Sequence, residues 1–358
     1  MEMKKWKMGF LIVVLFFAAV SIVFAAGQGE KAQGGSVTSV KTIKPENVYI
    51  GFSQVALNCP YYIAMERAAR ETAKKLGVKI TILNADGDVA KQIDQINNLL
   101  VQGINGLIVN SVTEYGTQPV IKQVRARGIP VVAIDRNLYG DYIAYIGIDQ
   151  WKAGVLQGKY ISEKLLPNGG NIVLLEGDPG GPANIGRMNG MLSVLNNEKN
   201  KGKYHILGKY AAYYNQSKGL TKMEEAIAAY GDKIDLVYAA NDAMGLGALQ
   251  ALQEAGLTKV MICSIDGQKE AYEEIMKGGQ YKSTVVNNSW DITHIAMKVL
   301  YNYLTKGMTP AQTVAQIKKE DPKLGATVYM KGDKQIITGT VLVTADNVKK
   351  FYNPNAVF

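Results

Sequence analysis

The feature that most constrains this chain is an alternation of short β-branched runs with longer stretches of helical period, which begins at residue 48. Pro60 to Leu76 places apolar residues at helical spacing, and Asp88 to Val101 does the same. Such alternation is typical of parallel sheets covered by helices on both faces. The predicted strands are Val48 to Phe52, Val78 to Leu83, Gly106 to Val109, Val131 to Ile134, Ile172 to Leu175, Leu236 to Ala239, Val260 to Ile265 and Ser283 to Val286.

These strand and helix units are too numerous for one compact sheet of ordinary size. A natural break lies at residues 145–149, where a short extended run follows the fourth unit, and a second block begins at Asn171. The tail is different, because two extended segments, Ala326 to Met330 and Gln335 to Val343, follow the helix predicted over Asp291 to Leu304. We therefore predict an α/β fold with two doubly wound parallel-sheet lobes.

The first residues carry the pattern of a secretory signal. A basic start precedes an apolar run from Met8 to Phe24, and Val23-Phe24-Ala25 suits cleavage after Ala25. We predict that residues 1–25 are a signal peptide that directs export to the periplasm. An uncleaved membrane anchor is the alternative, because the run is near the lower length limit for spanning. Residues 26–45 contain few large apolar groups and are predicted to be a flexible linker.

Charge and cysteine content argue against several classes of protein. The formal net charge is +9, but lysines alternate with acids, as in Lys318-Lys319-Glu320-Asp321, so we predict a solvated surface and no nucleic-acid partner. Two cysteines, Cys59 and Cys263, are too few for a disulfide framework. Cys263 stands in an apolar run, which predicts a buried free thiol.

Catalytic motifs are missing from the sequence. It contains no Gly-x-Ser-x-Gly elbow, no Walker A loop and no Gly-x-Gly-x-x-Gly fingerprint. The histidines, His205 and His294, are not near a plausible nucleophile in the sequence, and no residues have the spacing of metal ligands. We predict that the protein is not an enzyme and uses no metal or cofactor.

Hydrogen-bonding residues follow the predicted strands at their carboxyl ends, where open α/β sheets bind ligands. Charged side chains make strong hydrogen bonds to hydroxyl groups, and nearby aromatic rings offer flat apolar surfaces. Each residue also has a structural alternative, because Asx residues cap helices and tyrosines fill cores. The polar residues are Ser53, Asp135-Arg136, Asn241-Asp242, Asp266 and Asn287-Asn288, and the aromatic residues are Tyr61-Tyr62, Tyr213-Tyr214 and Trp290. This set favours a small ligand rich in hydroxyl groups, such as a sugar.

Several stretches of the sequence resemble one known family. They are Gly51-Phe52-Ser53 with Asn58-Cys59-Pro60-Tyr61-Tyr62, Ile129-Pro130-Val131-Val132-Ala133-Ile134-Asp135-Arg136, Gly186-Arg187-Met188-Asn189-Gly190, Ala240-Asn241-Asp242-Ala243-Met244-Gly245-Leu246-Gly247-Ala248 and Ser264-Ile265-Asp266-Gly267. The chain resembles the periplasmic sugar-binding proteins of the ribose-binding type, which are type I periplasmic binding proteins of ABC transporters. The resemblance runs from Val48 to Val343.

The resemblance implies a set of ligand-binding residues. In the family pattern, the charged residues and amides bind hydroxyl groups, while Tyr62 and Tyr214 enclose the sugar ring. Cys59 stands where ribose binders have an amide, tyrosine replaces phenylalanine around the ring, and Asn287 replaces a longer glutamine. These departures leave the sugar class intact but argue against ribose itself. The implied residues are Ser53, Cys59, Tyr61, Tyr62, Asp135, Arg136, Arg187, Tyr214, Asn241, Asp266 and Asn287.

The resemblance also implies how the lobes are built. A three-strand hinge would join an N-terminal lobe of residues 46–147 plus 288–325 to a C-terminal lobe of 148–287 plus 326–358, with the ligand cleft between them. Ligand binding would close the hinge. The implied partners are a monosaccharide-like molecule and an ABC transporter permease, with a chemoreceptor as a further candidate, and the implied state is a periplasmic monomer. No role is assigned to the long segment 305–337.

Two alternatives share the two-lobed architecture. A sugar-responsive transcription regulator would carry an N-terminal helix-turn-helix, where this chain carries its predicted signal peptide. A binding protein for an autoinducer-like furanose or an inositol, or a sensing protein linked to a chemoreceptor, is compatible with the same sequence.

Overall fold

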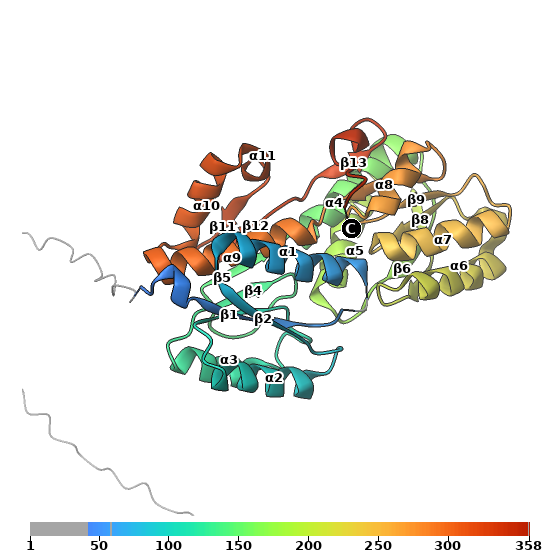
Figure 1. Ribbon diagram of the computed structural model, residues 1–358. Helices are drawn as coiled ribbons and strands as arrows, with labels where there is room; N and C mark the ends of the chain where they lie inside the picture. Colours follow the sequence, from blue (N-terminus) through green and yellow to red (C-terminus); the bar gives the residue numbers. More distant parts are fainter. Residues whose placement is uncertain (1–41, 58, 357) are drawn as a thin grey trace, which may run out of the picture. The chain divides into compact units, whose positions relative to one another are not determined.

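The computed structural model describes residues 42–57, 59–356 and 358 (Figure 1). The predicted signal peptide, residues 1–25, lies outside the described residues, as does most of the linker predicted over residues 26–45. Within the described part of the chain, no helix is both long enough and apolar enough to cross a membrane.

Seven strands form the first sheet, in the order β11-β12-β5-β4-β3-β1-β2 (Figure 1). Neighbouring strands are parallel except β11, which runs antiparallel to β12 at the edge. The central strands are fully buried and rich in aliphatic residues, as parallel strands covered on both faces must be. The strands are β1 Tyr49–Gln54, β2 Lys79–Asn84, β3 Gly106–Val109, β4 Val131–Ile134, β5 Ala144–Gly147, β11 Tyr329–Lys331 and β12 Gln335–Ile337.

Helices cover both faces of the first sheet. One face packs against α1 and α9 around Met65, and the opposite face packs against α2 and α3 around Leu99 (Figure 1). Asp88 and Asn288 cap α2 and α9 by accepting hydrogen bonds from backbone N–H groups of the first turn. The helices are α1 Pro60–Leu76, α2 Val89–Val101, α3 Gln118–Ala126, α9 Ser289–Lys306, α10 Pro310–Glu320 and α11 Pro322–Gly325.

Six strands form the second sheet, in the order β13-β10-β9-β8-β6-β7. All neighbours are parallel except β13, which runs antiparallel to β10 at the edge. Cys263 of β9 is a fully buried free thiol, as predicted. The strands are β6 Gly170–Glu176, β7 Tyr204–Ala211, β8 Leu236–Ala239, β9 Met261–Cys263, β10 Tyr281–Val285 and β13 Leu342–Thr344.

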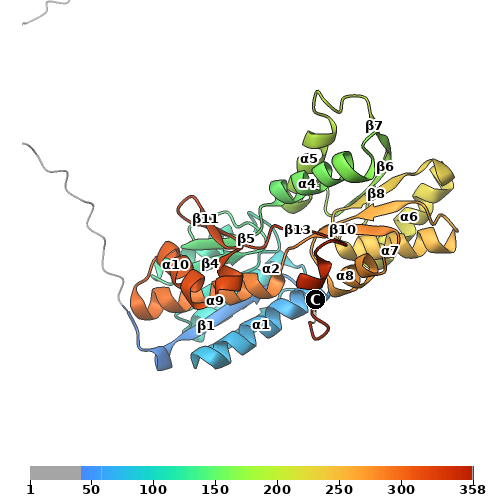
Figure 2. The same cartoon turned by 90° about the horizontal axis from the view of Figure 1, so that it is seen from above.

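Glycines bring α4 and α5 of the second lobe into close contact (Figure 2). A Cβ atom on Gly154 of α4 would lie 2.1 Å from the Arg187 carbonyl oxygen, and one on Gly190 of α5 would lie 2.2 Å from that of Trp151. The close approach fixes the position of Arg187 on α5. The helices are α4 Gln150–Tyr160, which continues as a π-helical turn over Ile161–Leu165, α5 Pro182–Leu195, α6 Gln216–Tyr230, α7 Asp242–Glu254 and α8 Lys269–Met276.

The chain passes between the two sheets three times, after β5, after β10 and after β12. The prediction of an α/β fold with two doubly wound parallel-sheet lobes is confirmed. Short 3-10 turns complete the described elements at Pro45–Asn47, Gly231–Lys233 and Val348–Lys350.

The predicted lobe boundary at residue 325 is wrong for the two strands that follow it. The prediction places residues 326–358 in the second lobe, but β11 and β12 belong to the first sheet, where Ile336 pairs with Ile146 of β5. The reason is that β5 offers an edge for a parallel partner, and joining it buries Ile336 and Ile337. Residues 42–45, assigned to the linker, also join this lobe, because the Ile43 N–H donates to the Leu304 carbonyl at 2.9 Å.

The segment 305–337 holds two helices and a hairpin rather than an extended connection. Helix α10 begins with a capping box, in which Thr309 and Gln312 exchange hydrogen bonds, and α11 follows directly. The extended segment predicted over Ala326 to Met330 begins only at Tyr329, and the segment predicted over Gln335 to Val343 is interrupted after Ile337.

Candidate functional site

A cavity of about 460 Å³ is lined by residues of both lobes. Its walls include the residues that follow β3 and β4, the start of α4 and the loop before α5. Three predicted site residues, Asp135, Arg136 and Tyr214, line this cavity.

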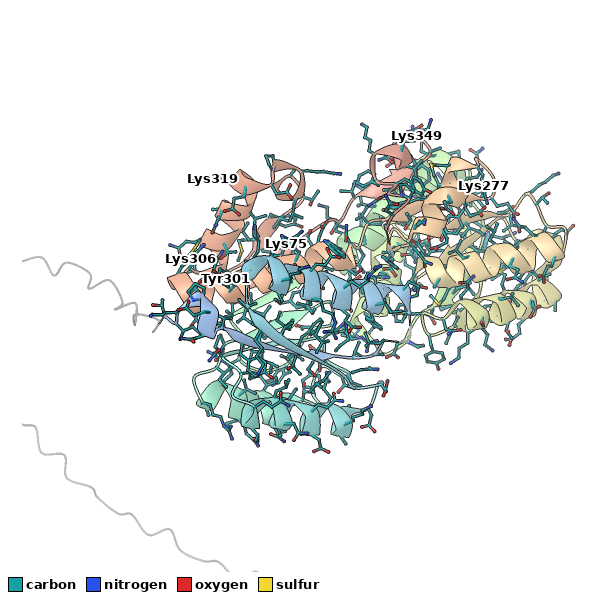
Figure 3. The ribbon with its side chains drawn as sticks, in the orientation of Figure 1. Lys75, Lys277, Tyr301, Lys306, Lys319 and Lys349 are labelled. Atoms are coloured by element: carbon teal, nitrogen blue, oxygen red, sulfur yellow. The ribbon has the colours of Figure 1, made fainter. Side chains whose placement is uncertain are left out.

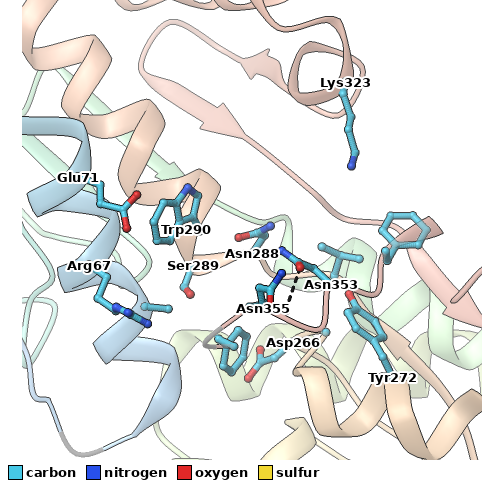
Figure 4. Close-up of a pocket in the computed structure, with 16 residues that line it drawn as sticks. Arg67, Glu71, Asp266, Tyr272, Asn288, Ser289, Trp290, Lys323, Asn353 and Asn355 are labelled. Atoms are coloured by element: carbon cyan, nitrogen blue, oxygen red, sulfur yellow. Dashed lines mark hydrogen bonds between the residues drawn. The ribbon is translucent and has the colours of Figure 1, made fainter. Parts of the chain in front are cut away.

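A second cavity of about 410 Å³ shares none of these lining residues. Figure 4 shows around it Arg67 of α1, Trp290 of α9, Asp266 and Tyr272 of the second lobe, and Asn353 and Asn355 near the end of the chain. The predicted site residues are therefore divided: Asp266 lines this cavity, Asp135, Arg136 and Tyr214 line the larger one, and the other seven line neither.

Asp135 follows β4 and accepts hydrogen bonds from two neutral side chains. The Tyr61 hydroxyl donates to Oδ1 at 2.9 Å, and the Asn110 Nδ2 donates to Oδ2 at 3.3 Å. The Tyr145 hydroxyl donates to the Asp135 backbone carbonyl at 2.8 Å. These contacts hold a half-buried carboxylate at the wall of the larger cavity.

Arg136 lies beside Asp135 and contacts Tyr62. Its Nη1 donates to the Val112 carbonyl at 3.0 Å, and its Nη2 donates to the Tyr62 hydroxyl at 3.4 Å. Burial raises the pKa of Tyr62, so its hydroxyl stays protonated at neutral pH. These contacts hold the guanidinium beside the Tyr62 hydroxyl at the wall of the larger cavity.

Asp266 follows β9 and is paired with a cation. Its Oδ1 lies 3.0 Å from Arg187 Nη2 and accepts from the Asn287 Nδ2 at 3.0 Å. Arg187 also donates to the Gln150 side chain at 2.7 Å and to the Ala240 carbonyl at 2.6 Å. Burial raises the pKa of Asp266 to about 6, and the Arg187 charge opposes that rise. Three predicted site residues therefore form one buried ion-pair cluster.

Tyr214 and Asn241 lie together in the second lobe. The Asn241 Nδ2 donates to the Tyr214 carbonyl at 3.5 Å, while its Oδ1 accepts from the Met244 N–H at 3.0 Å. Asn241 is therefore the N-cap of α7, which was its structural alternative. Burial raises the pKa of Tyr214 to about 12.

The structure does not bring Ser53 to either cavity. Ser53 is fully buried in β1, and its hydroxyl accepts from the Gln92 Nε2 at 3.0 Å. Cys59 directly precedes α1 and is half-buried. Burial raises the pKa of the Cys59 thiol, and the Asp266 and Asp135 charges raise it further, so the group is a neutral thiol.

Asn110 contacts the candidate site residue Asp135 and was not among the predicted residues. It follows β3 directly, so the strand-end rule that selected Asp135 would also have selected it. Its Nδ2 donates to Asp135 and to the Gln54 side chain, at 3.3 and 2.9 Å. It is fully buried and lines neither cavity.

Three polar atoms on predicted site residues or on their hydrogen-bond partners are buried and have no hydrogen-bond partner among the described residues. They are Asn110 Oδ1, the Tyr214 hydroxyl and Asn287 Oδ1. The Ser289 hydroxyl at the second cavity is also buried and unpaired. A buried unpaired polar group costs about 1 to 3 kcal/mol, so such groups indicate a missing partner. Two acceptors and one hydroxyl suit a ligand that both donates and accepts.

Several residues of the candidate site have a strained backbone. Among the described residues, the non-glycine residues with positive φ are Asp86, Asp135, Tyr213, Tyr214 and Asp266. Three of these are predicted site residues. Such conformations persist where the surrounding structure holds them, which is common at binding sites.

Tyr61 connects the site to the segment 351–358. Its ring packs edge-on against Phe358 at a centroid distance of 5.0 Å and against Tyr62 at 5.6 Å. The same segment is bound to α8, because Lys269 Nζ donates to the Pro354 carbonyl at 2.8 Å. The segment therefore contacts both lobes beside the second cavity.

Surface lysines are distributed over separate elements. Lys75, Lys277, Lys319 and Lys349 come from α1, the end of α8, α10 and the turn after β13 (Figure 3). Lys277 forms an ion pair of 2.6 Å with Glu274. This distribution fits a solvated surface rather than one basic face.

Comparison with known proteins gives consistent matches. Residues 50–308 match the family model described as periplasmic binding protein domain. The ribose import binding protein of Bacillus subtilis is 30% identical over 275 residues, which are 76% of this chain and 87% of that protein. The xylitol-binding protein of Mycolicibacterium smegmatis is 28% identical over 92% of this chain and 93% of that protein.

A solved structure has the same fold. It is an ABC transporter solute-binding protein from Mycobacterium smegmatis with bound glycerol, 29% identical, with a TM-score of 0.74 over 86% of this chain and 98% of that one. The relatives are binding proteins rather than enzymes. The chain therefore belongs to the periplasmic binding protein family, and it is a solute-binding protein.

Proposed function

We propose that the protein captures a monosaccharide or a related polyol between its lobes and delivers it to an ABC transporter permease. The observation that carries this proposal is the cavity lined by Asp135, Arg136 and Tyr214. Buried, unpaired polar atoms accompany it on Tyr214 at this cavity, on Asn110 beside Asp135 and on Asn287 beside Asp266. Hydroxyl groups donate and accept hydrogen bonds, so one small polyhydroxylated molecule can satisfy all three atoms.

The two carboxylates have complementary roles in this proposal. Asp135 accepts from ligand hydroxyls on the side of the first lobe, and Asp266 does so on the side of the second lobe. Arg136 and Arg187 donate to ligand oxygens, while Tyr62 and Tyr214 cover the apolar faces of the ring. Closing the lobes brings these groups onto one molecule and excludes water from it.

The names of the relatives support a polyhydroxylated ligand. The curated relatives are named for ribose and xylitol, and the solved relative contains glycerol. These molecules share vicinal hydroxyl groups and carry no net charge. The pattern at residues 1–25 supports export to the periplasm, where a permease receives the loaded protein.

A thermal-shift screen of pentoses, hexoses, polyols and inositols tests the ligand class. A compound that binds only the native state at 100 times its Kd stabilises the protein by about 2.7 kcal/mol. We expect a clear rise in Tm with at least one sugar or polyol, and a smaller rise in the Asp135→Asn variant. A rise only with inositols or an autoinducer-like furanose would support the alternative ligand, and no rise with any compound would contradict the proposal.

Export is tested separately. Protein recovered from the periplasm without detergent should begin at residue 26, because cleavage is predicted after Ala25. Full-length protein starting at Met1, found only in membranes, would indicate the anchor instead. Loss of sugar uptake in cells that lack the permease, with binding intact, would support delivery to the permease. Loss of attraction to the sugar with uptake intact would point to a chemoreceptor.

A further inference from the structure

Asp242 is a fully buried carboxylate that accepts hydrogen bonds only from neutral donors among the described residues. The Gln268 backbone N–H donates to Oδ2 at 2.6 Å. The Thr284 and Tyr281 hydroxyls donate to Oδ1 at 2.8 and 3.2 Å, and the Ser264 hydroxyl also donates to Oδ1. Burying a carboxylate is costly, so four converging donors indicate a structural task.

The hydrogen bonds of Asp242 connect it to the turn formed by residues 266–268. Asp242 binds the Gln268 N–H directly. It also binds the Gly267 N–H through a relay, because Gly267 donates to Thr284 Oγ1 at 3.1 Å and Thr284 donates to Asp242. Two successive backbone N–H groups after Asp266 are therefore held by one carboxylate.

This turn needs such support because its backbone is strained. The φ angle of Asp266 is 139°, and that of Gly267 is 78°. A Cβ atom on Gly267 would lie 2.3 Å from the Tyr272 hydroxyl, so only glycine fits there. Holding a non-glycine residue at a positive φ costs about 1 to 3 kcal/mol of stability, and the conformation persists only where the surrounding structure fixes it.

We propose that Asp242 is the positioning residue for Asp266, acting through Thr284 and the Gln268 N–H to hold the turn that presents Asp266 to the ligand. Asp242 lines neither cavity and touches no ligand group itself. This inference rests on the proposed function, because Asp266 is a ligand-binding residue only there. A displacement of the turn would move the Asp266 carboxylate away from Arg187 and Asn287.

A pair of matched variants tests the proposal. Thr284→Val keeps the side-chain shape but removes the relay to Gly267, whereas Ser264→Ala removes one donor to Asp242 and leaves the turn connected. We expect Thr284→Val to weaken binding of the best compound from the sugar and polyol screen by at least about tenfold. Ser264→Ala should change it by less than about twofold, and Thr284→Ser, which keeps the hydroxyl, should restore binding.

Two further measurements separate positioning from general destabilisation. In an Asp266→Asn background, Thr284→Val should cause no further loss of affinity, because the group that it positions is already altered. Amide hydrogen exchange of Gly267 and Gln268 in the ligand-free protein should accelerate by at least about tenfold in Thr284→Val and not in Ser264→Ala.

Three results would overturn the proposal. They are wild-type affinity in Thr284→Val, an equal loss of affinity in the two matched variants, and an undiminished effect of Thr284→Val in the Asp266→Asn background. If no sugar or polyol binds the wild-type protein, the proposed function fails. The exchange rates of Gly267 and Gln268 then still decide whether Asp242 and Thr284 hold the turn.

Discussion

Each lobe contributes one aspartate to the candidate site, and the two aspartates differ in their burial and in their partners. Asp135 of the first lobe is half-buried, and its side chain accepts, among the described residues, only from the neutral Tyr61 hydroxyl and Asn110 amide. Asp266 of the second lobe is 7% exposed and is paired with Arg187. In the ligand-free protein, Asp266 therefore already has a cationic partner. Asp135 accepts from neutral groups, and in our proposal its charge is free to accept hydrogen bonds from the ligand.

The largest expected effect comes from breaking the buried pair. Arg187→Ala leaves the Asp266 carboxylate buried without its cation, which should lower the free energy of unfolding by about 3 to 5 kcal/mol. Arg136→Ala is the matched control, because Arg136 is half-buried at the cavity wall and should cost about 1 kcal/mol. Urea unfolding of ligand-free protein measures both values. Equal losses would contradict the contrast between the lobes.

A change in charge at Asp135 should act on binding instead. Asp135→Asn keeps the shape of the side chain and tolerates the positive φ of this residue, so stability should change by only about 0.5 kcal/mol. Affinity should fall by at least about tenfold, because hydrogen bonds to charged groups contribute about 1.5 to 3 kcal/mol. Calorimetric titration and melting curves of the ligand-free protein separate the two effects.

Asp266 follows its strand as Asp135 follows β4, but its ion pair with Arg187 predicts a different effect on stability. Removing the Asp266 carboxylate by Asp266→Ala should destabilise the ligand-free protein, because Arg187 would then be a buried cation without its anion. Similar melting temperatures for the alanine variants of both aspartates would contradict the structure.

A smaller effect should appear with pH. Burial raises the pKa of Asp266 to about 6, so the carboxylate takes up a proton as the pH falls below that value. Affinity should therefore decline below about pH 6. The stability of the ligand-free protein should change in the opposite direction. A raised pKa favours the protonated form, and its stabilising contribution, present at low pH, is lost as the pH rises through about 6.

Asp266→Asn is the control for both pH effects. Asparagine does not titrate, so the decline in affinity below about pH 6 should disappear in this variant. The comparison with wild type also separates the titration of Asp266 from that of Asp291. Burial raises the pKa of Asp291 to about 6 as well. A pH profile of affinity that is the same in the two proteins would assign the titration to another group.

The smallest expected effect is spectroscopic. Trp290 lines the second cavity next to Asn288, whereas Trp151 at the start of α4 is 51% exposed. Ligand that draws the lobes together should shift tryptophan emission mainly through Trp290. Trp290→Phe should remove most of the shift and Trp151→Phe little of it. The reverse order would place the moving contact at α4.

The strands that the sequence predicted best are buried on both faces. β3, β4 and β8 have the predicted bounds, because each is a short apolar run that ends at or within one residue of a polar residue. Strands β11 and β12 lie in the first sheet and not in the predicted second lobe, because nothing local in their three residues each indicates which sheet they join. Helix α10 could have been found, because its capping box and proline stand in the sequence.

The positions of the candidate site residues after their strands could be predicted from the sequence, but the hydrogen bonds and ion pairs among them could not. The strand-end rule placed Asp135 and Asp266 correctly after β4 and β9, and it would have found Asn110 if applied to β3. It could not show that Ser53 is used within the core or that Asn241 caps a helix. Those outcomes depend on partners distant in sequence, as does the pairing of Arg187 with Asp266.

The pairing of β12 with β5 has a consequence for the order of folding. Gln335 lies beside Tyr145, so the first sheet is not complete until nearly the whole chain is present. Contacts between such distant segments form slowly, because a long loop must close before they stabilise anything. A nascent chain would therefore remain incompletely folded until its last strands emerge. That delay suits a polypeptide that we propose crosses a membrane before it folds.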